Sequence, residues 1–271
     1  MQIVFDRAAV RRHRDRAAAT VGRVAPVLAD AAERLLERLD DTTRRFTTAL
    51  DIGGRGVVTP LLRARGIATT SCDLSPRMAA LSPGAVAADE ECLPFADESF
   101  DLVVASLALH WVNDLPGALL LIRRALRPGG LFLGSIPLLG TLAELRTALG
   151  EAEAALLGGV SPRVSPFPAL SDCAGLLLRA GFSLPVADAE EIRLLYAEPL
   201  MLLRELRWAG EANAVAERDR RTPPRALFAA ALAALPQQDG RAVATLRLGM
   251  LTGWKEAPGA TPSPLAATSP S

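Results

Sequence analysis

The stretch Phe46-Thr-Thr-Ala-Leu-Asp-Ile-Gly-Gly-Arg-Gly56 decides the fold that this sequence predicts. A short apolar run ends in Asp51, a glycine cluster follows at once, and an amphipathic stretch begins at Val57. This order is typical of a strand, a tight loop and a helix. Glycines in such a loop let a ligand approach the backbone and leave amides free at the start of the helix. Alone, the pattern also fits an ordinary turn, so its interpretation depends on the segments that follow.

Those segments repeat the alternation of strand and helix. Strands are expected at 47–52, 67–73, 85–88, 100–106 and 131–136, with helical segments between most of them. Such alternation predicts an α/β fold with a parallel, doubly wound sheet. In such a sheet a nucleotide-like ligand lies at the carboxyl ends of the strands.

The second expected strand also ends in an acid, Asp73. Its distance along the chain from Asp51 is close to the roughly 20 residues expected between a glycine loop and a ribose-binding acid. A carboxylate there can accept hydrogen bonds from both ribose hydroxyls. The alternative is that Asp73 only caps the helix expected to begin at Ser75-Pro76.

Composition limits the classes of partner and compartment. The chain has 30 basic and 30 acidic residues, so we expect no nucleic-acid partner. No apolar run reaches the roughly 18 residues of a membrane span. The N-terminus lacks the apolar segment of a secretory signal, and Asp6 and Asp15 argue against a transit peptide. The three cysteines form no Cys-x-x-Cys pair, so we expect no metal site of that kind and a cytoplasmic location.

The flanking regions divide the chain into three predicted parts. Residues 1–45 contain an Arg-rich segment and an amphipathic segment, both expected to be helical, and form an N-terminal helical cover. The main domain is expected at 46–256, with an insertion at about 141–240, and a disordered tail at 257–271. The positive charge of the first helix faces either an anionic ligand or solvent.

Within the second half, several elements are expected by residue range. A helix over 141–157 would be capped by Thr141 and Glu144, which have the spacing of a capping box. Two strands are expected at 183–187 and 192–196, and 243–252 is expected to form the final edge strand of the sheet.

Two further segments carry a family resemblance. They are Ala88-Asp-Glu-Glu-Cys-Leu-Pro-Phe-Ala-Asp-Glu-Ser-Phe-Asp-Leu-Val104 and Leu126-Arg-Pro-Gly-Gly-Leu131. Together with the glycine loop and the two acid-terminated strands, they resemble the class I S-adenosylmethionine (SAM)-dependent methyltransferases over residues 46–136. The resemblance implies a Rossmann-like, seven-stranded, mostly parallel sheet with the N-terminal helical cover and a C-terminal helical insertion. It also implies SAM as the cofactor.

Carried over position by position, the resemblance implies a set of site residues. The implied cofactor-binding residues are Asp51, Gly53, Gly54, Gly56, Asp73, Leu74, Asp89, Glu90 and Ser106. The implied floor of the reaction pocket spans 106–111, so His110 and Trp111 are expected to face the substrate, and Tyr196 and Glu205 are further substrate-facing candidates.

A second, narrower resemblance spans nearly the whole chain. Its segments include His110-Trp-Val-Asn-Asp-Leu-Pro-Gly-Ala118, Ser161-Pro-Arg-Val-Ser-Pro-Phe167 and Glu205-Leu-Arg-Trp-Ala-Gly-Glu-Ala-Asn213. They are similar to the family of the mitochondrial complex I assembly factor with arginine hydroxylase activity. The bacterial relatives of that family resemble the malonyl-carrier methyltransferase of biotin synthesis. We therefore expect a bacterial cytoplasmic methyltransferase acting on a protein or small molecule. The alternative is an arginine hydroxylase or assembly factor with a respiratory complex I subunit as partner.

The glycine loop departs from the family pattern. Asp51-Ile-Gly-Gly-Arg-Gly56 is one residue short, and Leu138-Leu-Gly140 stands where the family often has Gly-Gly-Asp. A shorter loop moves amides relative to the cofactor and favours a third alternative, a scaffold that binds SAM without turnover.

The chemistry expected of a methyltransferase is mainly positioning. A dedicated base is optional, so the catalytic residue is left unassigned, with His110 as the candidate base or hydrogen-bond donor. A hydroxylase that uses oxygen at non-haem iron would need two histidines and one carboxylate as iron ligands. The chain has two histidines, His13 and His110, and Asp15 near His13 would supply the carboxylate. Finally, we expect the Arg-rich N-terminal helix to pack over the SAM cleft.

Overall fold

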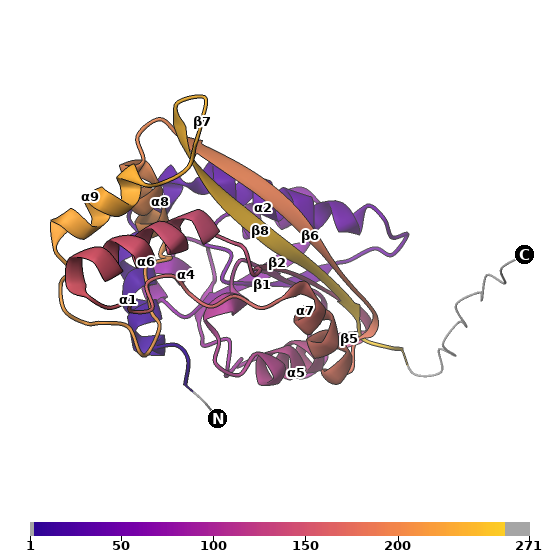
Figure 1. Ribbon diagram of the computed structural model, residues 1–271. Coiled ribbons are helices and arrows are strands. Elements are labelled where there is room, and N and C mark those ends of the chain that lie inside the picture. The colour runs from indigo at the N-terminus through magenta and orange to yellow at the C-terminus, as the bar shows by residue number, and fades with distance from the viewer. Residues whose placement is uncertain (1–2, 258–271) are drawn as a thin grey trace, which may run out of the picture.

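The computed structural model describes residues 3–257. Within them, eight strands form one sheet with helices on both faces (Figure 1). Apart from residue 257, the predicted disordered tail at 257–271 lies outside the described residues.

Five parallel strands form one half of the sheet. In spatial order they are β3 (Val86–Ala87), β2 (Ala68–Asp73), β1 (Thr48–Ile52), β4 (Phe100–Ser106) and β5 (Leu126–Pro137). Every residue of β4 is buried, as expected for a central strand covered on both faces. The parallel order brings the carboxyl ends of β1, β2 and β4 to the same edge of the sheet.

Two long antiparallel strands complete the sheet. β8 (Arg241–Trp254) pairs with β5 on one side and with β6 (Ser183–Tyr196) on the other, and the short β7 (Gln237–Gln238) pairs with β8. The predicted α/β fold with a mostly parallel sheet is confirmed.

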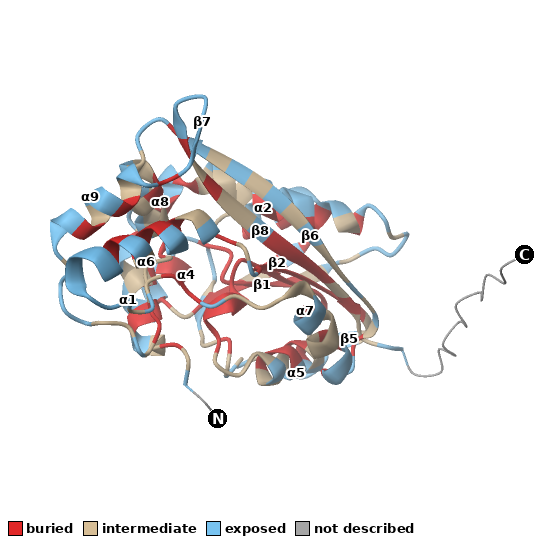
Figure 2. Cartoon of the chain, viewed as in Figure 1, coloured by how far each residue is buried: buried red, intermediate tan, exposed pale blue. Residues whose placement is uncertain are grey.

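Helices cover the two faces of the sheet. On one face α5 (Leu115–Ala125) and α7 (Leu170–Arg179) share an apolar core with β4 and β5. On the other face α2 (Ala25–Leu36) and α3 (Val58–Ala64) share a second core with the same strands. Figure 2 shows the central strands as the buried layer between these helices.

A third apolar cluster lies beyond the ends of the parallel strands. It joins α6 (Ala143–Leu157), α8 (Leu200–Ala209) and α9 (Arg225–Ala233) to the outer ends of β6 and β8. The first helix, α1 (Arg7–Ala17), contacts both α8 and the short α4 (Pro76–Ala79), which follows β2. Three short 3-10 helices complete the described elements, at Val21–Arg23, Glu37–Leu39 and Leu109–Trp111.

Three expectations for the second half are wrong. The strands expected at 183–187 and 192–196 form one continuous strand, β6, because β8 pairs with most of its length. The expected edge strand at 243–252 is an interior strand, since β8 has partners on both sides. The capping box at α6 does not form, because Thr141 instead donates to the Arg247 carbonyl oxygen at 2.8 Å, and Glu144 accepts from Thr245.

The domain boundaries predicted at 1–45 and 46–256, with an insertion at about 141–240, stay a prediction. The elements are consistent with them, since α1 and α2 precede the first strand and α6, α8 and α9 form their own apolar cluster.

Candidate functional site

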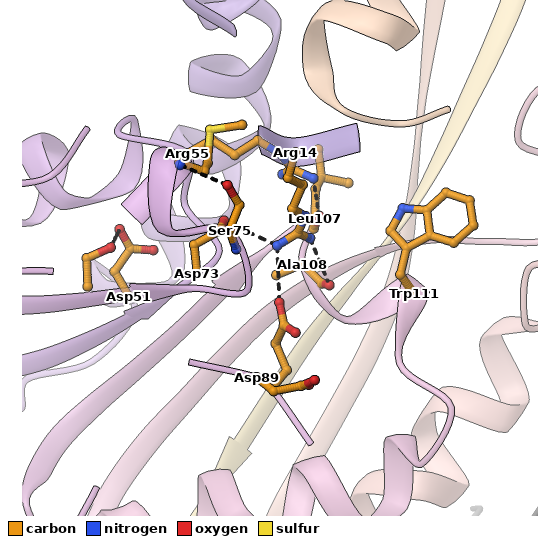
Figure 3. A network of polar contacts seen from close by, with 12 residues as sticks. Arg14, Asp51, Arg55, Asp73, Ser75, Asp89, Leu107, Ala108 and Trp111 are labelled. Atoms are coloured by element: carbon orange, nitrogen blue, oxygen red, sulfur yellow. Dashed lines mark hydrogen bonds and ion pairs between the residues drawn. The ribbon is translucent and has the colours of Figure 1, made fainter. Parts of the chain in front are cut away.

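A buried arginine lies at the carboxyl ends of the parallel strands (Figure 3). Arg14 of α1 is 0% exposed, and its Nη1 lies 3.2 Å from Asp73 Oδ2 and 3.1 Å from Glu90 Oε1. Its Nη2 donates to the Ala108 carbonyl oxygen at 3.4 Å. Burial alone would lower the pKa of Arg14, but the carboxylates of Asp73 and Glu90 raise it above its ordinary value, so the guanidinium stays charged.

A second arginine of the same helix reaches the same acids. Arg7 Nη2 lies 2.5 Å from Asp89 Oδ1 and also pairs with Glu90, and its Nη1 donates to the Trp111 carbonyl oxygen at 3.1 Å. The buried face of α1 therefore presents two guanidinium groups to the acids at and after the ends of β2 and β3. The remaining arginines of the helix are exposed. Helix α1 thus lies against acids that the resemblance implies for the cofactor, while its packing over the SAM cleft stays a prediction.

The glycine loop is built around the carboxylate of Asp51. Gly53 and Gly56 have φ angles of 65° and 77°, which favour glycine. At Gly54 a Cβ would lie 2.1 Å from Asp51 Oδ1, so no side chain fits there without a shift. Asp51 Oδ2 accepts from Thr59 Oγ1 at 2.7 Å, whereas Oδ1 has no partner. Burial raises the pKa of Asp51 to about 6.

Arg55, the arginine of the glycine loop, points into the protein. It is buried, its Nη2 donates to the Leu107 carbonyl oxygen at 3.0 Å, and it pairs with Glu211. Glu211 Oε2 lies 2.6 Å from His110 Nε2 and accepts from Trp111 Nε1 at 2.6 Å. Burial alone would raise the pKa of Glu211, but His110 and Arg55 hold it well below its ordinary value.

A large cavity adjoins this cluster and runs between α6, α8 and α9. Its volume is about 860 Å³. All four residues expected to face the substrate line it, namely His110, Trp111, Tyr196 and Glu205. Tyr196 Oη donates to Glu205 Oε2 at 2.7 Å. Burial is the larger cause that raises the pKa of Tyr196, and the Glu205 carboxylate adds to it. The structure thus gathers these residues, while their roles stay a prediction.

The residues expected to bind the cofactor are brought together only in part. Asp73, Glu90 and Gly53 surround the Arg14 guanidinium, and Asp89 joins them through Arg7. The others have separate partners: Asp51 and Gly54 lie against each other, and Gly56 faces Leu81. Ser106 Oγ lies 3.3 Å from Ser135 Oγ, and Leu74 packs in the apolar cluster of Phe5 and Trp111.

The candidate iron ligands do not converge. His13 Nδ1 lies 3.1 Å from the Ala212 carbonyl oxygen, Asp15 accepts from Ser75 Oγ at 2.5 Å, and His110 contacts Glu211. Across the residues that the structure describes, no group of three or more His, Cys, Asp or Glu is arranged to hold a metal ion. Over the same residues, none of the helices has the length and apolar character needed to cross a bilayer.

Sequence reasoning missed three residues of the site: Arg14, Arg55 and Glu211. Glu211 lies within the segment 205–213 that carried the family resemblance, and Arg14 lies in the Arg-rich segment. Each gains its partners from segments far along the chain, and the sequence pattern does not specify those partners.

The residues fit SAM in chemistry. Asp73 offers a carboxylate for the ribose hydroxyls, the glycine loop offers close backbone approach, and Glu90 adds a second acceptor. In this conformation, however, Arg14 already uses Asp73 and Glu90.

Comparison with known proteins identifies the family of this chain. A methyltransferase domain model matches residues 50–134. The zebrafish arginine-hydroxylase NDUFAF5, named as mitochondrial, is 35% identical over 93% of this chain and 83% of its own length. The malonyl-[acyl-carrier protein] O-methyltransferase of Halorhodospira halophila is 36% identical over 92% of this chain and 88% of its own.

A solved structure shows the same fold. The YcgJ protein of Bacillus subtilis aligns with a TM-score of 0.55 at 16% identity, covering 82% of this chain and 97% of that one.

These names correct one expectation. The prediction of a bacterial cytoplasmic protein is wrong, because the zebrafish and human relatives are named as mitochondrial. The match confirms the predicted methyltransferase-like domain and its cofactor, S-adenosylmethionine. The chain belongs to the class I SAM-dependent methyltransferase superfamily, in a family that it shares with the zebrafish arginine-hydroxylase and the Halorhodospira methyltransferase.

Proposed function

We propose that this chain transfers a methyl group from SAM to an acceptor that enters the 860 Å³ cavity. One observation carries the proposal. The cavity begins at Arg55, Leu107, His110 and Trp111, which follow β1 and β4, and extends between the leucine-rich helices beyond them. An acceptor in the cavity therefore lies beside the strand ends where the superfamily binds its cofactor.

The cofactor supplies an electrophilic methyl group, so the chain's own residues need mainly to place the acceptor. Glu211 holds His110 Nε2 and Trp111 Nε1 on one carboxylate oxygen, which orients both rings in the cavity wall. His110 Nδ1 is buried and has no hydrogen-bond partner. These contacts support roles for His110 and Trp111 in positioning.

The cavity wall favours an acceptor with an apolar chain and an acidic group. Leu142, Leu145, Leu202 and Leu206 contribute to an apolar wall, and arginines such as Arg163, Arg204, Arg207 and Arg225 also line it. Apolar pockets with a few convergent polar groups are typical of small-molecule sites. The Halorhodospira relative is named for malonyl-carrier methylation, which is consistent with such an acceptor.

A radiochemical assay tests this proposal. The protein is incubated with methyl-tritiated SAM and malonyl-loaded acyl carrier protein, with unloaded carrier as the control. We expect label on the loaded carrier only. Leu203→Trp fills the cavity and is expected to reduce transfer on the order of tenfold or more without changing SAM affinity. Leu120→Trp, at an exposed position on α5, is the matched control. SAM binding with no transfer to any acyl acceptor would leave the scaffold alternative.

A second candidate function has its own observation. Glu211 already accepts a guanidinium, that of Arg55, and Glu205 is a further carboxylate in the same cavity. A protein arginine could be held in the same way. The zebrafish relative is named an arginine-hydroxylase, and the family resemblance makes a respiratory complex I subunit the proposed partner. Mass spectrometry of arginine-containing peptides distinguishes an added oxygen from an added methyl group.

A further inference from the structure

The position of Arg14 has a consequence for cofactor binding. We infer that Arg14 is a built-in occupant of the cofactor site, and that SAM binds only when this guanidinium is released from Asp73. The inference rests on the proposed cofactor site and is independent of the acceptor.

The first support is geometric. Arg14 Nη1 lies 3.2 Å from Asp73 and 3.1 Å from Glu90, two of the acids assigned to the cofactor. A Cβ on Gly53 would lie 3.3 Å from the same nitrogen, so the guanidinium also lies against the glycine loop. Arg14 Nη2 reaches the Ala108 carbonyl oxygen beyond β4. One side chain therefore touches the groups expected to surround the ribose, and Figure 3 shows it between Asp73 and Ala108.

The second support is burial. Asp73 is 3% exposed and Glu90 1% exposed, with Arg14 completely buried above them. Neither acid is among the described residues that line the large cavity. With Arg14 in place, a ligand of SAM's size cannot contact both buried acids, so binding requires that this side chain leave its present position.

The third support is charge. Asp73 would be a buried carboxylate without a paired cation if Arg14 were absent, which is costly, whereas Glu90 would keep Arg7. SAM carries a sulfonium cation, so it brings a positive charge into the site that the guanidinium leaves. Arg7 keeps its own contacts to Asp89 and Glu90 during this exchange.

The residues just before α1 contact the wall of the cavity. The Phe5 ring packs edge-on against Trp111 at a centroid distance of 5.3 Å, and the Phe5 amide donates to Asn113 Oδ1 at 2.8 Å. Asp6 N donates to the Ala214 carbonyl oxygen at 2.8 Å. Release of Arg14 from its acids thus acts on a helix whose N-terminal end contacts a residue of the cavity wall.

Hydrogen exchange of the wild-type protein gives the first test. Deuterium uptake is measured with and without saturating SAM, for peptides covering 7–17 and 48–59. We expect SAM to speed exchange in 7–17, because α1 loses its Arg14 contacts, and to slow it in 48–59, where the cofactor contacts the loop. Slower exchange in 7–17 would overturn the inference, because it would mean that the helix closes onto the cofactor.

Calorimetry of variants gives the second test. Arg14→Met removes the competing cation, and we expect SAM affinity to rise by about tenfold or more, as expected when a contact that closes a site is removed. Arg11→Met changes an exposed arginine of the same helix and is the matched control, with no change expected. Arg14→Lys keeps the charge and protects the fold if the Met variant proves unstable. The Lys variant is expected to bind SAM more tightly than wild type, but with a smaller gain in affinity than the Met variant. The reason is that the ammonium group of the shorter lysine side chain still faces the acids.

The outcomes separate this inference from the proposed function. Weaker or unchanged SAM affinity in both Arg14 variants would overturn the inference, as would the absence of SAM binding in every variant. Tighter SAM binding without methyl transfer to any acceptor would support the inference and contradict the proposed methyl transfer.

Discussion

Asp51→Asn is expected to change how the stability of the protein depends on pH. The carboxylate is completely buried and one of its oxygens has no partner. Burial raises its pKa from 3.8 to about 6. A raised folded-state pKa means that the folded protein keeps a proton that the unfolded chain has lost, so stability falls as pH rises through this window. A shift of one pKa unit corresponds to about 1.36 kcal/mol, so above the folded-state pKa the buried carboxylate lowers the free energy of unfolding by about 3 kcal/mol.

Asn does not titrate, so the variant lacks this penalty. Between about pH 4.5 and about pH 7.5, the free energy of unfolding of Asp51→Asn minus that of wild type should rise by about 2 kcal/mol. Any constant cost of the amide cancels in this difference. Urea titrations at a series of pH values measure it, with equal m-values as the control for two-state unfolding. A flat difference, or one that falls with rising pH, would refute the assignment of a raised pKa to this buried carboxyl.

Three other substitutions have expected outcomes that denaturant titration measures. Gly54→Ala should lower the free energy of unfolding by about 3 kcal/mol, because its Cβ would lie 2.1 Å from the carboxylate at the end of β1; full retention of stability would contradict the loop geometry. Glu211→Gln should lower the free energy of unfolding by about 3 kcal/mol. This is the lower end of the range for breaking a buried ion pair, because the Glu211 side chain is 18% exposed. The exposed Glu217→Gln should cost nothing measurable, and equal costs for the two would count against the buried cluster. Tyr196→Phe should cost about 1–2 kcal/mol by removing the hydrogen bond to Glu205, and no loss would mean that this bond is not formed in solution.

The local pattern around the glycine loop predicted the first half of the fold well. The strand expected at 47–52 is β1, Thr48–Ile52, and the strand expected at 67–73 is β2, Ala68–Asp73. Apolar runs, glycines and strand-ending acids are short-range signals, and they decide where a strand ends and which residues reach the edge of the sheet.

Long-range packing decided the rest. Arg14 reaches Asp73 across 59 positions of sequence, and Arg55 reaches Glu211 across 156, so neither pair follows from spacing or periodicity. The same limit applies to β8, because whether a strand lies at the edge depends on a partner elsewhere in the chain. The sequence therefore pointed to acids, loop and cavity wall, and left open which of the chain's own cations lie among them.

The position of β6 at the side of the sheet affects how copies of the protein behave at high concentration. A 14-residue outer strand offers a row of backbone groups to a strand of another molecule, which is a route to aggregation. Charged side chains oppose this, and two of them pair with α2 and the 3-10 helix after it: Asp188 lies 2.6 Å from Arg38, and Glu190 lies 3.2 Å from Arg34. Replacing these acids with apolar residues would remove that protection, so loss of solubility would precede any loss of the site itself.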